Sequence, residues 1–257
     1  MTVRVGVFGA GGRMGSTVCA AVTADPELEL VAAVDPAHHG VEVAAGGVVI
    51  DGSTDAMVAA DVDVAVDFTH VDAARENIAW LAEQGIHAVV GTTGFTDADL
   101  VDFEAAFVGS NCLIAPNFAI GAVLMMRFAE LAAPYFDSAE VVELHHDEKI
   151  DAPSGTAMMT VERMAAASQS WAPDPTRNEV VDGARGGRGP AGIRIHSVRL
   201  RGLVAHQEVL LGTSGQTLRL RHDSYDRTSF MPGVLLAVKQ VGEAPGLTLG
   251  LDHVLGM

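Results

Sequence analysis

Short apolar runs alternate with helical patterns through the first part of the 257-residue chain. Five such runs are VRVGVFGA from Val3, LELVAAVD from Leu28, DVDVAVDF from Asp61, HAVVGTT from His87 and NCLIAPN from Asn111. Helical stretches lie between them, for example from about Met14 to Thr23 and from about Val71 to Glu83. Apolar strands that alternate with helices are typical of a parallel sheet with helices on its faces. We therefore predict an α/β fold with a Rossmann-type parallel-sheet domain over residues 1–118.

The pattern changes after Asn117. A long helical stretch from about Gly121 to Ala133 stops at Pro134, and the strand-like run SAEVVELHH leads to a second helix from about Ser154 to Ala167. Three further runs, IRIHSVRL, AHQEVLLG and QTLRLRHD, follow without intervening helices. This order predicts a second α+β domain over residues 119–227, with a mixed or antiparallel sheet and two helices. Residues 228–257 are expected to return to the first domain, and the glycine-rich segment 182–192 to form a mobile surface loop.

The formal net charge of −17 argues against nucleic-acid binding, which needs a basic stripe. The arginines are scattered, and the pairs Arg199/Arg201 and Arg219/Arg221 have the alternate spacing of a solvated strand face. The chain opens on a strand-like run rather than a signal peptide, and no apolar run approaches the roughly 18 residues of a membrane span. We expect a cytoplasmic protein that does not contact membranes, with both cysteines as buried thiols.

A glycine-rich turn follows the first strand. Gly9, Gly12 and Gly15 form a G-x-x-G-x-x-G variant of the dinucleotide-binding pattern, and Asp35 ends the next strand 20 residues after Gly15. Backbone N–H groups in such a turn approach a pyrophosphate at a helix N-terminus, and an acid at the second strand end binds a ribose hydroxyl. The turn alone also fits an ordinary strand–helix connection, but its context predicts a dinucleotide site.

Two later loops fall where strand ends should face the cofactor: residues 91–95, GTTGF, and residues 115–118, APNF. Ligands of open α/β sheets bind outside the carboxyl ends of the strands. Asp35 favours NAD(H), whereas Arg13 could reach a 2′-phosphate, so both NADH and NADPH stay open. His38 and His39 are interpreted as exposed loop histidines.

The segment HHDEKIDAPSGT, from His145 to Thr156, carries the most concentrated chemistry. Lys149 is one of two lysines in the chain, and Ser154 is a good N-cap for the helix that follows. The helix start offers N–H donors to a carboxylate, and His145 can exchange a proton near neutral pH. A capped helix after a polar loop would explain the same residues. Metal binding is less favoured, since adjacent strand residues point to opposite faces.

Together these motifs resemble the 4-hydroxy-tetrahydrodipicolinate reductase (dihydrodipicolinate reductase) family of the diaminopimelate and lysine pathway. The resemblance covers nearly the whole chain. It is carried by GAGGRMG in the first turn, VDFTH at 66–70, VVGTTGF at 89–95, APNFAIGAV at 115–123 and ELHHDEKIDAPSGTA at 143–157. Arg227 also matches an arginine at the hinge between the two domains of that family.

The resemblance implies that NADH or NADPH delivers hydride to a cyclic imine dicarboxylate, giving tetrahydrodipicolinate and water. By this analogy His145 and Lys149 handle protons. The substrate carboxylates would contact His146, Ser154, Gly155 and Thr156. The cofactor would be lined by Gly9, Ala10, Gly11, Gly12, Arg13, Met14, Asp35, Gly91, Thr92, Thr93, Ala115, Pro116, Asn117 and Phe118. No metal is expected. The family is typically a homotetramer.

Three positions depart from the family pattern. Glu148 stands where many relatives have a histidine, Asp147 replaces a neutral or basic residue, and Val71 replaces a proline. Two acids beside an anion site should weaken substrate binding unless they point outward. Two rival functions remain open: another two-domain NAD(P)-dependent amino-acid-pathway dehydrogenase, or a non-catalytic NAD(H)-binding module.

Overall fold

The computed structural model describes residues 2–43 and 47–257, which form two compact units. The first unit comprises Met1–Ala119 and Phe230–Met257, and the second comprises Ile120–Ser229. The chain therefore leaves the first unit once, builds the second without interruption, and returns. Each unit has its own sheet and its own apolar core.

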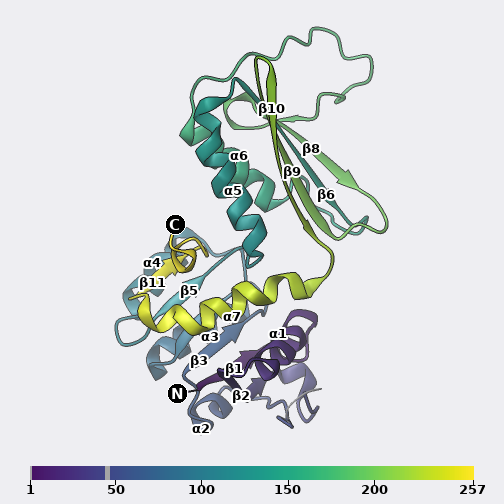
Figure 1. Ribbon diagram of the computed structural model, residues 1–257. Coiled ribbons are helices and arrows are strands. Elements are labelled where there is room, and N and C mark those ends of the chain that lie inside the picture. Colours follow the sequence, from purple (N-terminus) through teal and green to yellow (C-terminus); the bar gives the residue numbers. More distant parts are fainter. Residues whose placement is uncertain (1, 44–46) are drawn as a thin grey trace. The chain divides into compact units, whose positions relative to one another are not determined.

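The first unit is built on a six-stranded sheet in which every pair of neighbours is parallel (Figure 1). Its strands are β1 (Val3–Phe8), β2 (Leu28–Val34), β3 (Val64–Asp67), β4 (His87–Val90), β5 (Cys112–Ile114) and β11 (Leu247–Leu249). They lie in the order β11-β5-β4-β3-β1-β2. The predicted Rossmann-type sheet is confirmed, with the topological switch between β1 and β3, where such sheets bind ligands.

Helices pack on this sheet in two groups. The helices of the first unit are α1 (Arg13–Ala24), α2 (Asp55–Ala59), α3 (Val71–Gln84), α4 (Asp97–Ala106) and α7 (Met231–Gln240). α1 contacts α7, and α3 contacts α4. All four residues of β3 are buried, as expected for a strand covered on both faces. The sequence predicted that residues 228–257 return to the first domain, but not that they supply β11 as a sixth strand.

The second unit has a five-stranded sheet in the order β10-β9-β6-β8-β7. Its strands are β6 (Ser138–His145), β7 (Gly187–Arg188), β8 (Arg194–Arg199), β9 (Ala205–Thr213) and β10 (Gln216–Ser224). β6 and β8 are parallel and the other pairs are antiparallel, so the sheet is mixed, as predicted. The glycine-rich segment 182–192 is not loop throughout, because it contains β7 and a short 3₁₀ turn.

Two helices, α5 (Ile120–Ala132) and α6 (Gly155–Ala167), lie against one face of this sheet (Figure 1). Their apolar side chains pack on Val141 and Val209 in a core that includes Met125 and Val161. α5 ends before Pro134, which cannot continue an α-helix, and a 3₁₀ turn takes over. Short 3₁₀ turns occupy Pro36–His38, Ala133–Tyr135, Pro190–Gly192, Arg227–Phe230, Val241–Glu243 and His253–Leu255.

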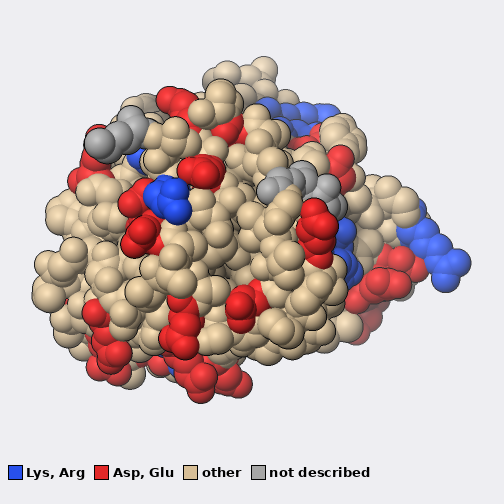
Figure 2. Space-filling model, turned by 90° about the horizontal axis from the view of Figure 1, so that it is seen from below, with Lys and Arg blue, Asp and Glu red and all other residues tan. Residues whose placement is uncertain are grey.

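The surface reflects the acidic composition. On the face that Figure 2 shows, acidic side chains are widely spread and basic ones lie in a few separate places. Within residues 2–43 and 47–257, none of the helices combines the length and the apolar character needed to cross a membrane. Both cysteines are free thiols in the interior, and burial raises the pKa of Cys19 to about 12.

Candidate active site

The glycine turn joins β1 to α1 at the switch point of the first sheet. Gly9 has φ of +68°, a conformation that favours glycine, and its carbonyl accepts the Gly12 N–H at 2.9 Å. A Cβ atom on Gly15 would lie 2.1 Å from the Gly9 carbonyl oxygen. The first turn of α1 therefore packs directly on the backbone of the loop. This is the close helix–strand approach that dinucleotide-binding turns require.

Asp35 lies at the end of β2, beside this turn. Its carboxylate accepts the Gly11 N–H at 3.1 Å and the Ala37 N–H at 3.0 Å, and it is 9% exposed. His38 is exposed, as predicted from the sequence, but its Nδ1 also lies 3.0 Å from the same carboxylate, a contact that was not predicted. Its ring lies over Gly11, where a Cβ atom would come within 2.2 Å of it.

The two later loops follow neighbouring strands. The Gly91 N–H bonds to Asp67 at the end of β3, and the Ala115 N–H bonds to Val90 at the end of β4. The structure therefore brings residues 91–93 and 115–118 together at the carboxyl end of the sheet. Pro116 and Thr93 are exposed, whereas Thr92 is buried and donates from its hydroxyl to the Thr69 carbonyl at 2.9 Å.

Asp67 lies at this end of the sheet, and no role for it was predicted from the sequence. Its buried carboxylate accepts from the Thr69 N–H and hydroxyl, both at 2.7 Å, and from Asn77 Nδ2 at 2.7 Å. The following Phe68 stacks at a tilt on Phe118, with ring centroids 5.8 Å apart. An acid at the last position of a buried strand is the signal that could have identified it, because such a group must find donors.

In the second unit, β6 ends at His145 and residues 146–154 lead to α6. Ser154 is the N-cap, and its hydroxyl oxygen accepts the Ala157 N–H at 3.2 Å. Gly155 and Thr156 form the first turn of α6, where the partial positive charge of a helix N-terminus favours a carboxylate. The predicted helix start is confirmed to the residue, and the peptide bond before Pro153 is cis.

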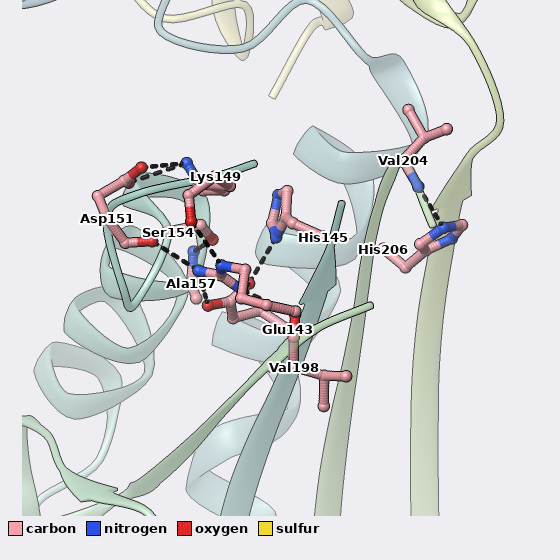
Figure 3. A network of polar contacts seen from close by, with 10 residues as sticks. Glu143, His145, Lys149, Asp151, Ser154, Ala157, Val198, Val204 and His206 are labelled. Atoms are coloured by element: carbon pink, nitrogen blue, oxygen red, sulfur yellow. Dashed lines mark hydrogen bonds and ion pairs between the residues drawn. The ribbon is translucent and has the colours of Figure 1, made fainter. Parts of the chain in front are cut away.

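His145 and Lys149 differ in their surroundings (Figure 3). The His145 side chain is 15% exposed, and its Nδ1 lies 2.5 Å from the carboxylate of Glu143. Burial lowers the pKa of His145 below its ordinary value, and the Glu143 carboxylate opposes that shift. Lys149 Nζ donates to both oxygens of Asp151, at 2.7 and 2.8 Å. This ammonium holds the pKa of the Asp151 carboxyl below its usual value.

The two unusual acids lie on the exposed part of the loop. Asp147 accepts a hydrogen bond from Arg201 Nε at 2.8 Å, and Glu148 and His146 are exposed. Arg201 thus offsets the charge of Asp147. Within the described part of the chain, no group of three or more His, Cys, Asp or Glu side chains is arranged to hold a metal ion.

Glu143 and Arg199 are part of the His145 environment that sequence reasoning missed. Glu143 has no exposed surface, and Arg199 binds both of its oxygens at 2.9 Å. The interpretation of Arg199 as part of a solvated strand face was therefore wrong. It is Arg201, beyond the end of β8 and 92% exposed, that reaches solvent.

Comparison with known proteins agrees with this geometry. A sequence model described as "Dihydrodipicolinate reductase, N-terminus" matches residues 3–118, and one described as "Dihydrodipicolinate reductase, C-terminus" matches residues 121–255. The chain is similar to the 4-hydroxy-tetrahydrodipicolinate reductases of Nocardia farcinica (52% identity, covering 100% of both chains) and Thermobifida fusca (52%, covering 99% of this chain and 100% of that one).

Among solved structures, it is similar to a dipicolinate-bound dihydrodipicolinate reductase from Paenisporosarcina sp. TG-14. The TM-score is 0.89 at 41% identity, and the match covers 98% of this chain and 99% of that one. Since both halves match the models of one family, and relatives share half of their residues with it along its whole length, the chain belongs to the dihydrodipicolinate reductase family.

Proposed function

We propose that the two units divide the work of a reductase, the first binding the nicotinamide cofactor and the second binding the substrate and supplying the proton. The reaction is the NAD(P)H-dependent reduction of 4-hydroxy-tetrahydrodipicolinate to tetrahydrodipicolinate and water, a step of diaminopimelate and lysine biosynthesis. The homologue from Paenisporosarcina was solved with dipicolinate, a small aromatic dicarboxylate, which supports a small dicarboxylate as substrate here.

The residues of the first unit fit a dinucleotide. Gly15 packs tightly on the backbone of Gly9, which brings the N-terminus of α1 close to the turn, and Asp35 is fixed beside Gly11. These residues would hold the pyrophosphate and the ribose, with residues 91–93 and 115–118 at the nicotinamide end. When bound, NADH or NADPH supplies the hydride.

The second unit supplies charge and protons. Hydride addition to a conjugated imine leaves an electron pair that must accept a proton. His145 and Lys149 carry the N–H groups that could donate it, and the first turn of α6 with Ser154 would hold a substrate carboxylate. One observation carries this assignment: Glu143 binds His145 Nδ1, so the opposite ring nitrogen, Nε2, is the one left for proton transfer.

Substitution of Lys149 tests the assignment. Lys149→Ala is expected to lower kcat by 10²–10⁴-fold, the usual contribution of a proton-transfer group, and to leave NADH affinity largely unchanged. His145→Ala should lose a smaller share. The matched control is Lys239→Ala, which removes the other lysine of the chain from its contacts with Glu27 and Asp25 on the first unit. A Lys149→Ala enzyme with near-normal turnover would refute the role.

We also infer that the protein is a homotetramer assembled through the second unit. The sheet of that unit ends on one side at β10, a strand of nine residues that pairs with β9 alone in the described chain. Such an edge favours pairing with another copy. Sedimentation equilibrium would test this, and a monomer at micromolar concentration would contradict it. The cytoplasmic location stays a prediction.

A further inference from the structure

Strand register brings four polar side chains together on one face of the second sheet. Glu143 and His145 are two residues apart on β6 and therefore point to the same side. The parallel register pairs Glu143 with Ser197 and His145 with Arg199 on β8. Val141 shares this face and packs on α5 and α6, so the group lies at the end of the helix-covered core.

The Glu143 carboxylate is buried but well satisfied. Arg199 binds it with Nη1 and Nη2, each at 2.9 Å, and His145 approaches Oε2 at 2.5 Å. Burial opposes the ionisation of Glu143, but hydrogen bonds from Arg199, Ser197 and His145 outweigh it and hold its pKa below the usual value. An ionised carboxylate only accepts hydrogen bonds, so the proton in this contact lies on His145 Nδ1.

The same guanidinium also holds the loop after β6. Arg199 Nη2 donates to the Asp151 carbonyl at 2.6 Å, and Nε donates to the Lys149 carbonyl at 3.3 Å. The side chains of Lys149 and Asp151 form an ion pair with each other, so Arg199 holds the backbone of both members of that pair. Figure 3 shows Glu143 beneath His145, with the loop that carries Lys149 and Asp151 beside them. The buried ion pair of Glu143 and Arg199 thus contacts the ring of His145 and the backbone of Lys149.

We propose that Glu143 and Arg199 are positioning residues of the reductase: Glu143 fixes the tautomer and charge of His145, and Arg199 fixes the backbone that presents Lys149. This inference rests on the proposed function of His145 and Lys149. A buried ion pair contributes little net stability compared with apolar side chains of similar size. We therefore attribute the role of this ion pair to the positions that it gives His145 and Lys149, and not to the stability of the fold.

The charges around His145 determine the expected pH effect. They are Glu143 on its own strand, Lys149 on the following loop and Arg199 on β8. Only Glu143 favours the protonated ring, since the two cations oppose it. Removal of the carboxylate should therefore make His145 lose its proton at lower pH. An enzyme that needs the protonated ring would then lose activity at lower pH than the wild type.

Glu143→Gln tests this directly, because glutamine keeps the shape and removes the charge. We expect kcat/KM to fall at least tenfold at pH 7.5 and its alkaline limb to move to lower pH by about one unit. A purely structural role would reduce kcat/KM by the same factor at every pH. A uniform loss, or wild-type rates, would overturn the proposal for Glu143.

Arg199→Lys is the second variant, and it keeps a positive charge beside Glu143. Lysine lacks the fork needed to bind both Glu143 oxygens and the loop carbonyls. We expect kcat to fall at least tenfold while the KM for substrate and the alkaline limb stay unmoved, whereas a purely structural role would change kcat and KM together. Wild-type kcat would overturn the role of Arg199. Circular dichroism and NADH titration would establish that each variant is folded, and if Glu143→Gln does not fold, Arg199→Lys alone decides the proposal.

The opposite face of the same strands offers a matched control. Glu140 on β6 binds His196 Nε2 on β8 at 2.8 Å and also pairs with Arg185. Glu140→Gln removes the same kind of carboxylate from the same kind of partners and should leave kcat/KM and its pH profile within about twofold. If Lys149→Ala and His145→Ala kept activity, the proposed function would fail. If only Glu143→Gln and Arg199→Lys behaved as wild type, the positioning role alone would fail.

Discussion

Gly15→Ala is expected to displace the glycine turn and weaken cofactor binding. The new Cβ atom would lie 2.1 Å from the Gly9 carbonyl oxygen, where ordinary contacts begin at 3.4 Å, so the two must separate by about 1.3 Å (3.4 minus 2.1). The contacted atoms belong to the backbone of Gly9 and Ala10 and cannot rotate away. Overpacking of this kind costs about 1–3 kcal/mol, against up to about 1 kcal/mol gained from replacing a helical glycine.

With the full gain from replacing the glycine, the net loss of stability in the first unit is therefore about 0–2 kcal/mol. Misplacement of a binding loop by about 1 Å can reduce function 10²-fold, so we expect the Kd for NADH to rise at least tenfold. NADH fluorescence titration measures the affinity, and thermal unfolding measures the stability.

Gly109→Ala is the matched control, because no atom lies within 4 Å of the added Cβ and the backbone has no positive φ. It should bind NADH like the wild type. If Gly15→Ala also bound NADH with unchanged affinity and unfolded at the wild-type temperature, the close packing of α1 on the turn would contribute neither to cofactor binding nor to stability.

Two further predictions concern histidines of the first unit. His38→Ala removes a hydrogen bond to Asp35 that competes with a ribose hydroxyl. NADH should therefore bind about fivefold more tightly, equivalent to about 1 kcal/mol. Weaker binding in the titration would mean that His38 contacts the cofactor instead. Burial lowers the pKa of His87, and its Nδ1 accepts the Asn111 N–H at 2.9 Å. The unfolded chain therefore binds the proton of His87 more strongly than the folded chain does. The stability that His87 contributes is complete above its unfolded pKa of about 6.5 and is lost as the pH falls below that value. His87→Gln should show a smaller drop in Tm between pH 7 and pH 5, and an equal drop would contradict this account.

Much of the first unit could be predicted because its strands are buried on both faces and read as apolar runs. β11 could not, since three residues, Leu247–Leu249, show no periodicity and gain their identity only by pairing with β5. In the second unit the segments of β6, β8, β9 and β10 were visible, whereas the two-residue strand β7 was not. The parallel pairing of β6 with β8 depends on a long connection that sequence patterns do not determine.

The candidate site divides in the same way. The residues at 145–156 stand close together in the sequence, so their chemistry could be recognised locally. Glu143 and Arg199 are 56 residues apart and meet only through strand register. From the sequence Glu143 is an ordinary strand acid and Arg199 an ordinary surface arginine. A buried ion pair between distant strands leaves no local pattern.

The late position of β11 in the chain has a consequence for synthesis. β11 packs beside β5, and the contact from Gly246 to Asn111 spans 135 residues. Translation therefore delivers the last strand of the first sheet only after the entire second unit. Until then β5 presents an open edge, which can pair with other chains. The second unit, continuous in sequence, can fold while the first is still waiting for its final strand, and chains truncated before Leu247 keep that edge exposed.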